Sequence, residues 1–319
     1  MRKIIIDTDP GIDDAAAIAI AMFSPQLDVQ LITTVSGNVS VEKTTHNALR
    51  LMTLWNSPVP VAAGASRPLA GTLVDGGDTH GESGMDGFAF EEVAVRPVKL
   101  HAVEAMRRVL ERSEEKVTLV PIGPLTNLAL LFVQYPEVKE KIEEIVLMGG
   151  AFLRGNITPV AEFNIYVDPE AADIVFRSGL PIVMCGLELA NMARITGPMV
   201  DAIRQNNPTA DMVYRLFEHY RDGDLETGLN MFDSTAVGYL LAPELYTTVD
   251  CFVGIETASP LTRGMTVCDL ENRLGRTPNA KVCTAVDPAG FQKLFLDALA
   301  SANGIPENPT AALWLYDEE

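Results

Sequence analysis

The sequence predicts an α/β fold in which an open, mostly parallel (mixed) sheet carries helices on both faces. Short apolar runs alternate with amphipathic or Ala/Leu-rich runs, and each early apolar run ends in a glycine-containing turn. Strands that alternate with helices form parallel βαβ units, whose sheet is covered on both faces. With 319 residues, of which 47% are hydrophobic, the chain can form a large core. We expect one domain over residues 1–319.

The first strand and helix illustrate the pattern. Ile4, Ile5 and Ile6 form an apolar run that leads through a Pro10-Gly11 turn into an Ala/Ile-rich run with strong helix propensity. The same order of strand, turn and helix repeats along the chain. The expected strands are Lys3–Asp7, Val29–Val35, Lys116–Pro121, Glu144–Met148 and Pro181–Cys185. The expected helices are Ile12–Phe23, Val41–Trp55, Ala102–Arg112, Leu125–Gln134 and Pro169–Ser178.

Beyond Gly186 the alternation is less regular. Residues 246–257 and 262–287 are typical of short strands joined by hairpin-type connections. Residues 303–319 contain Pro-adjacent turns and an acidic end, as in a C-terminal tail or an arm packed on the surface. The further expected helices are Thr209–Tyr220, Ala236–Leu241 and Gly290–Ala302.

The overall charge argues against several classes of partner. A formal net charge of −19 and a pI near 4.6 disfavour binding to nucleic acid or to an anionic membrane. No apolar run has the length of a membrane span, and Asp7 interrupts the N-terminal run before it could form a signal-peptide core. The four cysteines form no CxxC pair, so we expect buried free thiols in a reducing compartment. A cytoplasmic location is therefore expected.

Several well-known catalytic motifs are absent from the sequence. There is no P-loop, no GxGxxG after a strand, no GxSxG and no HExxH. The four histidines have no spacing typical of a zinc site. Nucleotide-cofactor enzymes, serine hydrolases and zinc enzymes are thus disfavoured.

Four acids crowd the first strand–helix junction: Asp7, Asp9, Asp13 and Asp14. Two unit charges about 4 Å apart repel by roughly 4 kcal/mol at an effective dielectric near 20. Either the side chains point apart into water, or a cation gathers them, and oxygen-only ligands suit Ca²⁺ or Mg²⁺. The simpler alternative is that Asp13 caps the helix, Asp14 lies in its first turn, and Asp7 and Asp9 are solvated strand-end residues.

Other polar residues should meet these acids at the same edge of the sheet. Ligands in open α/β sheets bind outside the carboxyl ends of the strands, so Asn38, Ile122 and Met148 should lie near the acids. Residues 79–87 are glycine-dense and polar, which is typical of a loop over a site or of a plain surface loop. Amide and carboxylate side chains within residues 154–164 suit the hydroxyls of a sugar, and the alternative is that they are ordinary cap and turn residues.

Longer motifs resemble the inosine-uridine-preferring nucleoside hydrolases, and among them the bacterial ribonucleoside hydrolases of broad base preference. The resemblance covers nearly the whole chain, in the order expected of the family, which implies a Rossmann-type nucleoside hydrolase fold. The motifs that carry it are Asp7-Thr8-Asp9-Pro10-Gly11-Ile12-Asp13-Asp14-Ala15, Thr33-Thr34-Val35-Ser36-Gly37-Asn38, His80-Gly81-Glu82-Ser83-Gly84, Gly123-Pro124-Leu125-Thr126-Asn127, Met148-Gly149-Gly150 and Ala161-Glu162-Phe163-Asn164-Ile165.

The resemblance implies a Ca²⁺-dependent N-glycosidase that splits ribonucleosides into ribose and a free purine or pyrimidine base, in nucleoside salvage. It implies that Asp9 takes a proton from the attacking water and that His80 lies in a loop closing over the base. It also implies a homodimer or homotetramer. The implied Ca²⁺ ligands are Asp9, Asp14, the carbonyl of Ile122, and Asp233. The implied ribose contacts are Asp13, Asn38 and Asn164 at the 2′- and 3′-hydroxyls, Asn156 and Glu162 at the 5′-hydroxyl, and Met148 against the ring.

One position departs from the family pattern. Many members have a histidine before the last metal-binding aspartate, taken to protonate the leaving base, whereas this chain has Phe232. Phe232 cannot donate a proton, and a lost general acid typically costs about 10²–10⁴ in rate. His80, Tyr220 or Arg221 could substitute, the substrate base could leave unprotonated, or purine nucleosides could be poor substrates with Phe232 as a stacking surface.

Two alternatives to an active hydrolase follow from the sequence. A non-catalytic or weakly active nucleoside-binding protein is consistent with Phe232. An aspartyl-nucleophile Mg²⁺ phosphatase would also place Asp-x-Asp after the first strand. It is disfavoured because Pro10 occupies its loop and no matching Thr/Ser-Lys-Asp set follows.

Overall fold

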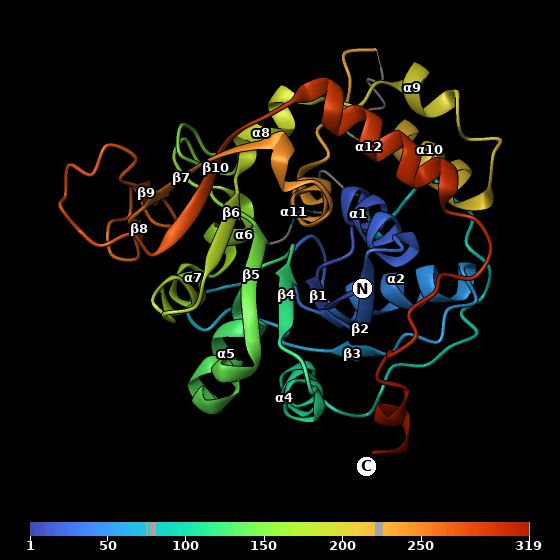
Figure 1. Cartoon of the computed structure of the whole chain (residues 1–319), viewed down its shortest axis with the longest axis horizontal. Helices are drawn as coiled ribbons and strands as arrows, with labels where there is room; N and C mark the ends of the chain where they lie inside the picture. The colour runs from blue at the N-terminus through green and yellow to red at the C-terminus, as the bar shows by residue number, and fades with distance from the viewer. Residues whose placement is uncertain (75, 77–80, 221–225, 319) are drawn as a thin grey trace.

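The computed structural model describes residues 1–74, 76, 81–220 and 226–318, and it confirms the predicted fold class. An eight-stranded sheet has the order β3-β2-β1-β4-β5-β6-β10-β7, and every neighbouring pair is parallel except β10 and β7 (Figure 1). The strands of this sheet are β1 (Arg2–Thr8), β2 (Leu27–Thr34), β3 (Val61–Ala63), β4 (Val117–Pro121), β5 (Ile142–Met148), β6 (Ile182–Cys185), β7 (Tyr246–Cys251) and β10 (Ala280–Val286). A separate hairpin pairs β8 (Val253–Ile255) with β9 (Thr266–Cys268).

Helices cover both faces of the sheet (Figure 1). One layer contains α1 (Ile12–Phe23), α2 (Val41–Leu54), α10 (Pro208–His219), α11 (Phe232–Leu241) and α12 (Pro288–Ser301). The opposite layer contains α4 (Ala102–Arg112), α5 (Thr126–Gln134) and α7 (Pro169–Phe176). The shorter helices are α6 (Phe163–Val167), α8 (Leu187–Met192) and α9 (Gly197–Asp201), with 3-10 turns at Pro136–Lys141, Pro243–Leu245 and Leu313–Asp317.

Strand β1 is an inner strand of the sheet, between β2 and β4. Its side chains alternate between the two cores: Ile4 and Ile6 pack on the α1 side, and Ile5 packs on the α4–α5 side. All three are at most 1% exposed, as expected for a parallel strand covered on both faces. The acidic residues that follow β1 therefore emerge at the carboxyl edge of the sheet, between the ends of β2 and β4.

The expected elements agree with the observed ones to within a few residues at most ends, but the short helices α6, α8 and α9 were not predicted, and the sheet differs in two places. Strand β3 was not predicted because it has only three residues and directly follows a proline-containing turn. The region 262–287 was expected to form hairpins, and only β9 does so. Strand β10 instead joins the main sheet, parallel to β6 and antiparallel to β7.

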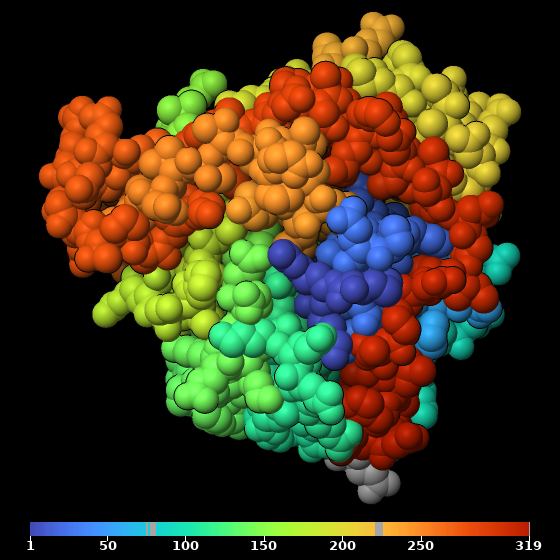
Figure 2. Space-filling model, in the orientation of Figure 1, coloured from blue at the N-terminus to red at the C-terminus, as the bar shows by residue number. Residues whose placement is uncertain are grey.

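The C-terminal segment packs on the surface along β2 (Figure 2, red beside blue). Asn308 Oδ1 accepts the Val29 N–H at 2.7 Å, and the Ala312 N–H donates to the Gln30 carbonyl at 2.9 Å. Glu318 pairs with Arg112 of α4 at 2.7 Å. These contacts tie the last described residues to an edge of the molecule away from the acidic cluster.

Three of the four cysteines are buried, Cys268 is partly exposed, and all four are free thiols. Within the described residues, none of the helices is both long and apolar enough to span a membrane.

Candidate active site

Asp14, in the first turn of α1, is completely buried and surrounded by neutral donors. Thr8 Oγ1 donates to Asp14 Oδ1 at 2.6 Å, while the Gly11 N–H and Asn38 Nδ2 donate to Asp14 Oδ2 at 2.9 and 3.2 Å. The tight Pro-Gly turn brings the end of β1 back over the helix start and so makes these bonds possible. Burial nevertheless raises the pKa of Asp14.

Asp9 is enclosed between two glycines. The Asn38 N–H donates to Asp9 Oδ2 at 2.7 Å, whereas Asp9 Oδ1 is buried without a hydrogen-bond partner. A Cβ atom at Gly37 would lie 2.0 Å from Asp9 Oδ2, and one at Gly123 would lie 2.5 Å from Asp9 Oδ1. Only glycine therefore allows the β2 and β4 loops to approach this carboxyl. Burial, and then the charge of Asp14, raise the pKa of Asp9 well above its ordinary value.

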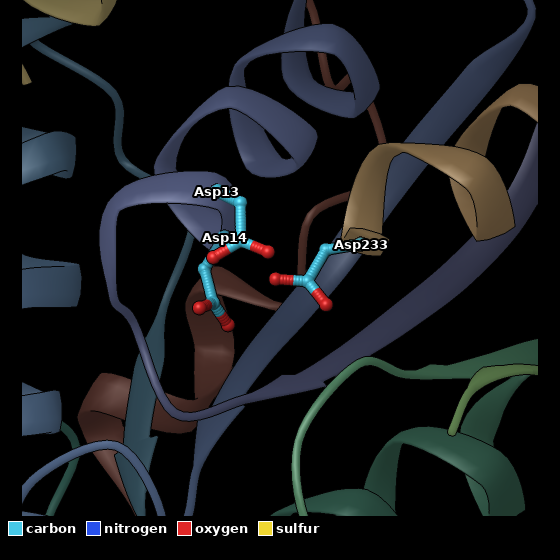
Figure 3. A group of neighbouring side chains, drawn as sticks. All are labelled: Asp13, Asp14 and Asp233. Carbon is cyan, nitrogen blue, oxygen red and sulfur yellow. The ribbon is translucent and has the colours of Figure 1, made fainter. Parts of the chain in front are cut away.

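The tightest group of acids consists of Asp13, Asp14 and Asp233, whose ligand oxygens lie within 4.8 Å of one another. Figure 3 shows the first two at the start of α1 and the third at the start of α11, with the carboxyl groups gathered between the two helices. Asp14 and Asp233 are in hydrogen-bond contact. Burial, followed by the charges of Asp13, Asp14 and Asp9, raises the pKa of Asp233 well above its ordinary value.

Such a group must share either protons or a cation, because several buried like charges at this separation repel strongly. The donor set contains only oxygen, and Asp9 Oδ1 has no partner among the described residues. Both observations fit a hard divalent cation.

A second group of predicted residues gathers around Asn164, in the short helix α6. Asn164 Nδ2 donates to the Ile122 carbonyl at 2.9 Å and to the Met148 carbonyl at 3.2 Å, and it lies 3.4 Å from Met148 Sδ. All three residues are buried. Since Gly123 lies against Asp9, this group adjoins the acidic one.

Glu162 and Asn156 hold the segment that follows β5. Glu162 is 2% exposed and caps α6, accepting the Asn164 N–H with Oε1 and the Gly150 and Ile165 N–H groups with Oε2. Burial raises the pKa of Glu162 to about 7. Asn156 is exposed, and its Oδ1 accepts the Phe163 N–H at 2.9 Å.

Asp7, the remaining acid of the cluster, faces away from the others. Its Oδ1 accepts hydrogen bonds from Thr33 Oγ1 at 2.5 Å and Asn127 Nδ2 at 2.8 Å, and its backbone carbonyl accepts the Ile122 N–H at 2.8 Å. Burial raises the pKa of Asp7 to about 7. Asp7 therefore supports the neighbouring strands from within the sheet.

The residues considered for protonation of a leaving base occupy different surroundings. Phe232 is the first residue of α11, directly before Asp233, and is 8% exposed. Tyr220 directly follows α10 as its C-cap residue and is 1% exposed within the α1-side core. His80 and Arg221 lie outside the described residues.

Sequence reasoning overlooked several residues that shape the site. Thr8 and the two glycines that enclose Asp9 were noticed only as parts of motifs and turns. Asn47 of α2 was missed: its Nδ2 donates to the Pro10 carbonyl at 3.0 Å and the Ser83 carbonyl at 2.8 Å, joining two loops. A glycine at the end of each neighbouring strand was the only available signal for the close approach to Asp9.

Comparisons with known proteins relate the whole chain to one family. Residues 4–293 match the family model described as inosine-uridine preferring nucleoside hydrolase. The chain is 53% identical over 299 residues to the non-specific ribonucleoside hydrolase RihC of Salmonella heidelberg (strain SL476), covering 94% of this chain and 98% of the relative. The corresponding protein of Salmonella typhi is 53% identical over 297 residues, covering 93% and 97%.

Solved structures show the same fold. A purine-preferring ribonucleoside hydrolase from Gardnerella vaginalis superposes with a TM-score of 0.87 at 30% identity. A plant nucleoside hydrolase superposes with a TM-score of 0.87 at 31% identity. Each comparison covers 94% of this chain and 99% of the other.

Proposed function

The chain belongs to the inosine-uridine-preferring nucleoside hydrolase family and is a ribonucleoside hydrolase, and we propose that it uses Ca²⁺ to hydrolyse both purine and pyrimidine ribonucleosides to ribose and free base. The observation that carries the metal-dependent part is the buried group of Asp13, Asp14 and Asp233. It lies beside Asp9, whose Oδ1 has no partner in the part of the chain that the structure describes. Among the described residues, no other group of three or more His, Cys, Asp or Glu side chains brings its ligand atoms this close together.

Asp9, Asp14, Asp233 and the Ile122 carbonyl would hold the ion. The oxygen-only donor set suits Ca²⁺, which takes six to eight oxygen ligands, and the Ile122 carbonyl retains a lone pair beyond its bond to Asn164. When bound, the ion would orient water and the sugar diol and lower the pKa of that water.

The residues of the chain would carry the remaining steps. Asp9, which lies beside the acidic group, would take the proton from the attacking water. Asp13, Asn38 and Asn164 would bind the 2′- and 3′-hydroxyls, and Met148 would pack against the ribose. The carboxylates near the sugar would stabilise the positive charge that develops on it as the glycosidic bond breaks.

Asn156 and Glu162 would bind the 5′-hydroxyl. Asn156 Nδ2 has no hydrogen-bond partner among the described residues, so it is available as a donor. Glu162 already accepts three backbone N–H groups, which fixes the direction of its carboxyl.

Phe232 would contribute an aromatic surface to the base rather than a proton. The base would then leave either unprotonated or with a proton from another group, for which His80 is the proposed donor. We expect weaker activity on purine nucleosides, whose departure depends more on protonation by the protein, than on pyrimidine nucleosides.

A turnover panel tests the proposal. Release of reducing sugar from inosine, adenosine, uridine and cytidine is measured with Ca²⁺ and after chelation by EDTA. Hydrolysis is expected with Ca²⁺, loss after chelation, and loss in Asp9→Asn. The control Asp297→Asn removes an acid with a 64% exposed side chain on α12 and should retain full activity. Full activity after chelation, or in Asp9→Asn, would refute the metal and base assignments.

The cellular setting is also proposed from general features of the chain. We propose that residues 1–319 act as one domain in the cytoplasm, in nucleoside salvage, as a homodimer or homotetramer. The strongly negative net charge supports a small neutral substrate over a nucleic acid or a membrane surface.

A further inference from the structure

Glu188 is a buried acid outside the acidic cluster. Among the described residues, its Oε1 accepts hydrogen bonds from one loop, and its Oε2 has no partner. It lies in α8, directly after β6, and is 6% exposed. Its Oε1 accepts the N–H groups of Phe152 at 3.0 Å and of Leu153 at 2.8 Å. Within the described part of the chain it forms no ion pair with Lys, Arg or His. Its carboxyl therefore serves the backbone of the loop that follows β5.

That loop, residues 149–161, carries Asn156 at its exposed tip. Its beginning is held by Glu162, which accepts the Gly150 N–H at 2.9 Å. Its tip is closed by the Asn156 N–H, which donates to the Ala161 carbonyl at 3.1 Å. Between these points the chain has no helix or strand, and the Leu153 side chain is 73% exposed. Thr266 Oγ1 holds Ala151, accepting its N–H at 2.9 Å and donating to its carbonyl at 2.6 Å, and Glu188 holds the next two residues, Phe152 and Leu153.

We propose that Glu188 is a positioning residue for the substrate: by holding the backbone of Phe152 and Leu153, it keeps the Asn156 amide directed at the 5′-hydroxyl of the ribose. This inference rests on the proposed function, in which Asn156 binds that hydroxyl. An exposed amide on an irregular loop keeps one direction only if its backbone is held. Hydrogen bonds from N–H groups to a carboxylate are stronger than those to a neutral acceptor, which suits this purpose.

The test compares two variants on two substrates that differ only in the 5′-hydroxyl, uridine and 5′-deoxyuridine. Glu188→Met keeps the side-chain length without an acceptor, whereas Glu188→Gln keeps an acceptor oxygen. Glu188→Met is expected to lower kcat/KM for uridine by about tenfold or more and to change it for 5′-deoxyuridine by less than about threefold. Glu188→Gln should stay within about threefold of the wild type on both substrates. In an Asn156→Ala background, Glu188→Met should cause no further loss on uridine.

An equal fall on both substrates would show a purely structural role and overturn the inference. Wild-type hydrolysis without any preference for uridine over 5′-deoxyuridine would overturn the assignment of Asn156 and the role of Glu188 with it. Absence of wild-type hydrolysis of uridine would instead overturn the proposed function. If Glu188→Met does not fold, Glu188→Ser, which leaves room for water beside the loop, is judged by the same ratio of the two substrates.

Discussion

Asp233→Asn is expected to stabilise the metal-free protein while abolishing its stabilisation by Ca²⁺. The ligand oxygens of Asp233, Asp13 and Asp14 lie within 4.8 Å of one another. Two unit charges at that separation repel by roughly 3.5 kcal/mol at an effective dielectric near 20. Partial protonation already relieves some of this repulsion, since the pKa of Asp233 is raised well above its ordinary value. We therefore expect the free energy of unfolding of metal-free Asp233→Asn to exceed that of the metal-free wild type by about 2 kcal/mol near neutral pH.

Thermal unfolding in EDTA and in excess Ca²⁺ measures both effects. For a chain of 319 residues, an unfolding entropy of about 2.1 cal/mol/K per residue makes 1 kcal/mol equal to roughly 1.5 °C in Tm. Asp233→Asn should then melt about 3 °C above the wild type in EDTA. Free Ca²⁺ at about 100 times Kd should add about 2.7 kcal/mol to the free energy of unfolding of the wild type, which raises its Tm by about 4 °C. The variant should lack this rise.

Asp297→Asn is the matched control, because its side chain is 64% exposed on α12. It should leave both melting temperatures and the effect of Ca²⁺ unchanged. A lower Tm of Asp233→Asn in EDTA would refute the repulsion argument. An equal Ca²⁺ effect in the variant and the wild type would refute the metal assignment.

Three further outcomes are expected. Phe232→His should raise kcat for inosine by about tenfold or more if protonation of the base limits the rate, while unchanged base release would mean that another group already donates. The pKa of Glu162 is raised from 4.5 to about 7, so the native state binds the extra proton between these values and stability falls as pH rises through them. Urea unfolding at pH 5 and pH 8 measures this fall. The decrease in unfolding free energy between the two pH values should be about 3 kcal/mol smaller in Glu162→Gln than in the wild type. An unfolding free energy that differs from the wild type by the same amount at both pH values would contradict the raised pKa. Asn308→Ala strands the Val29 N–H and should lower stability by about 1–3 kcal/mol with kcat unchanged, and altered kcat would contradict a purely structural role for the arm.

Local signals were sufficient to predict much of the fold. The Ile-rich run and the Ala-rich run on either side of Pro10-Gly11 indicated a strand and a helix, and the structure has β1 (Arg2–Thr8) and α1 (Ile12–Phe23) there. Parallel pairing followed from the alternation of such units. Strand β3 was too short to leave a periodic signal, and the pairing of β10 with β6 joins residues about 100 positions apart.

The residues of the candidate site were predicted mainly from ordered motifs, and their contacts were not. The family resemblance implied that Asp233 joins Asp9 and Asp14 as a metal ligand, but local composition did not indicate that it would approach Asp13 and Asp14 from the start of α11. The enclosure of Asp9 by Gly37 and Gly123 depends on how three loops pack at the sheet edge. The role of Glu188 depends on a loop that precedes it by more than thirty positions. Such contacts follow from tertiary packing, for which local composition carries little signal.

The unequal surroundings of Asp14 and Asp233 indicate why a cation would be needed at all. Asp14 receives three hydrogen bonds from neutral donors, which compensate a buried charge without a metal. Asp233 receives none from an N–H or hydroxyl group of the described residues, and its hydrogen-bond contact is with the Asp14 carboxyl. The fold thus stabilises the charge of Asp14 by hydrogen bonds, whereas the charge of Asp233 has to be neutralised by a proton or a cation. Sites built for function commonly retain such local instability, and Asp233 is therefore the acid whose neutralisation should most increase the stability of the metal-free protein.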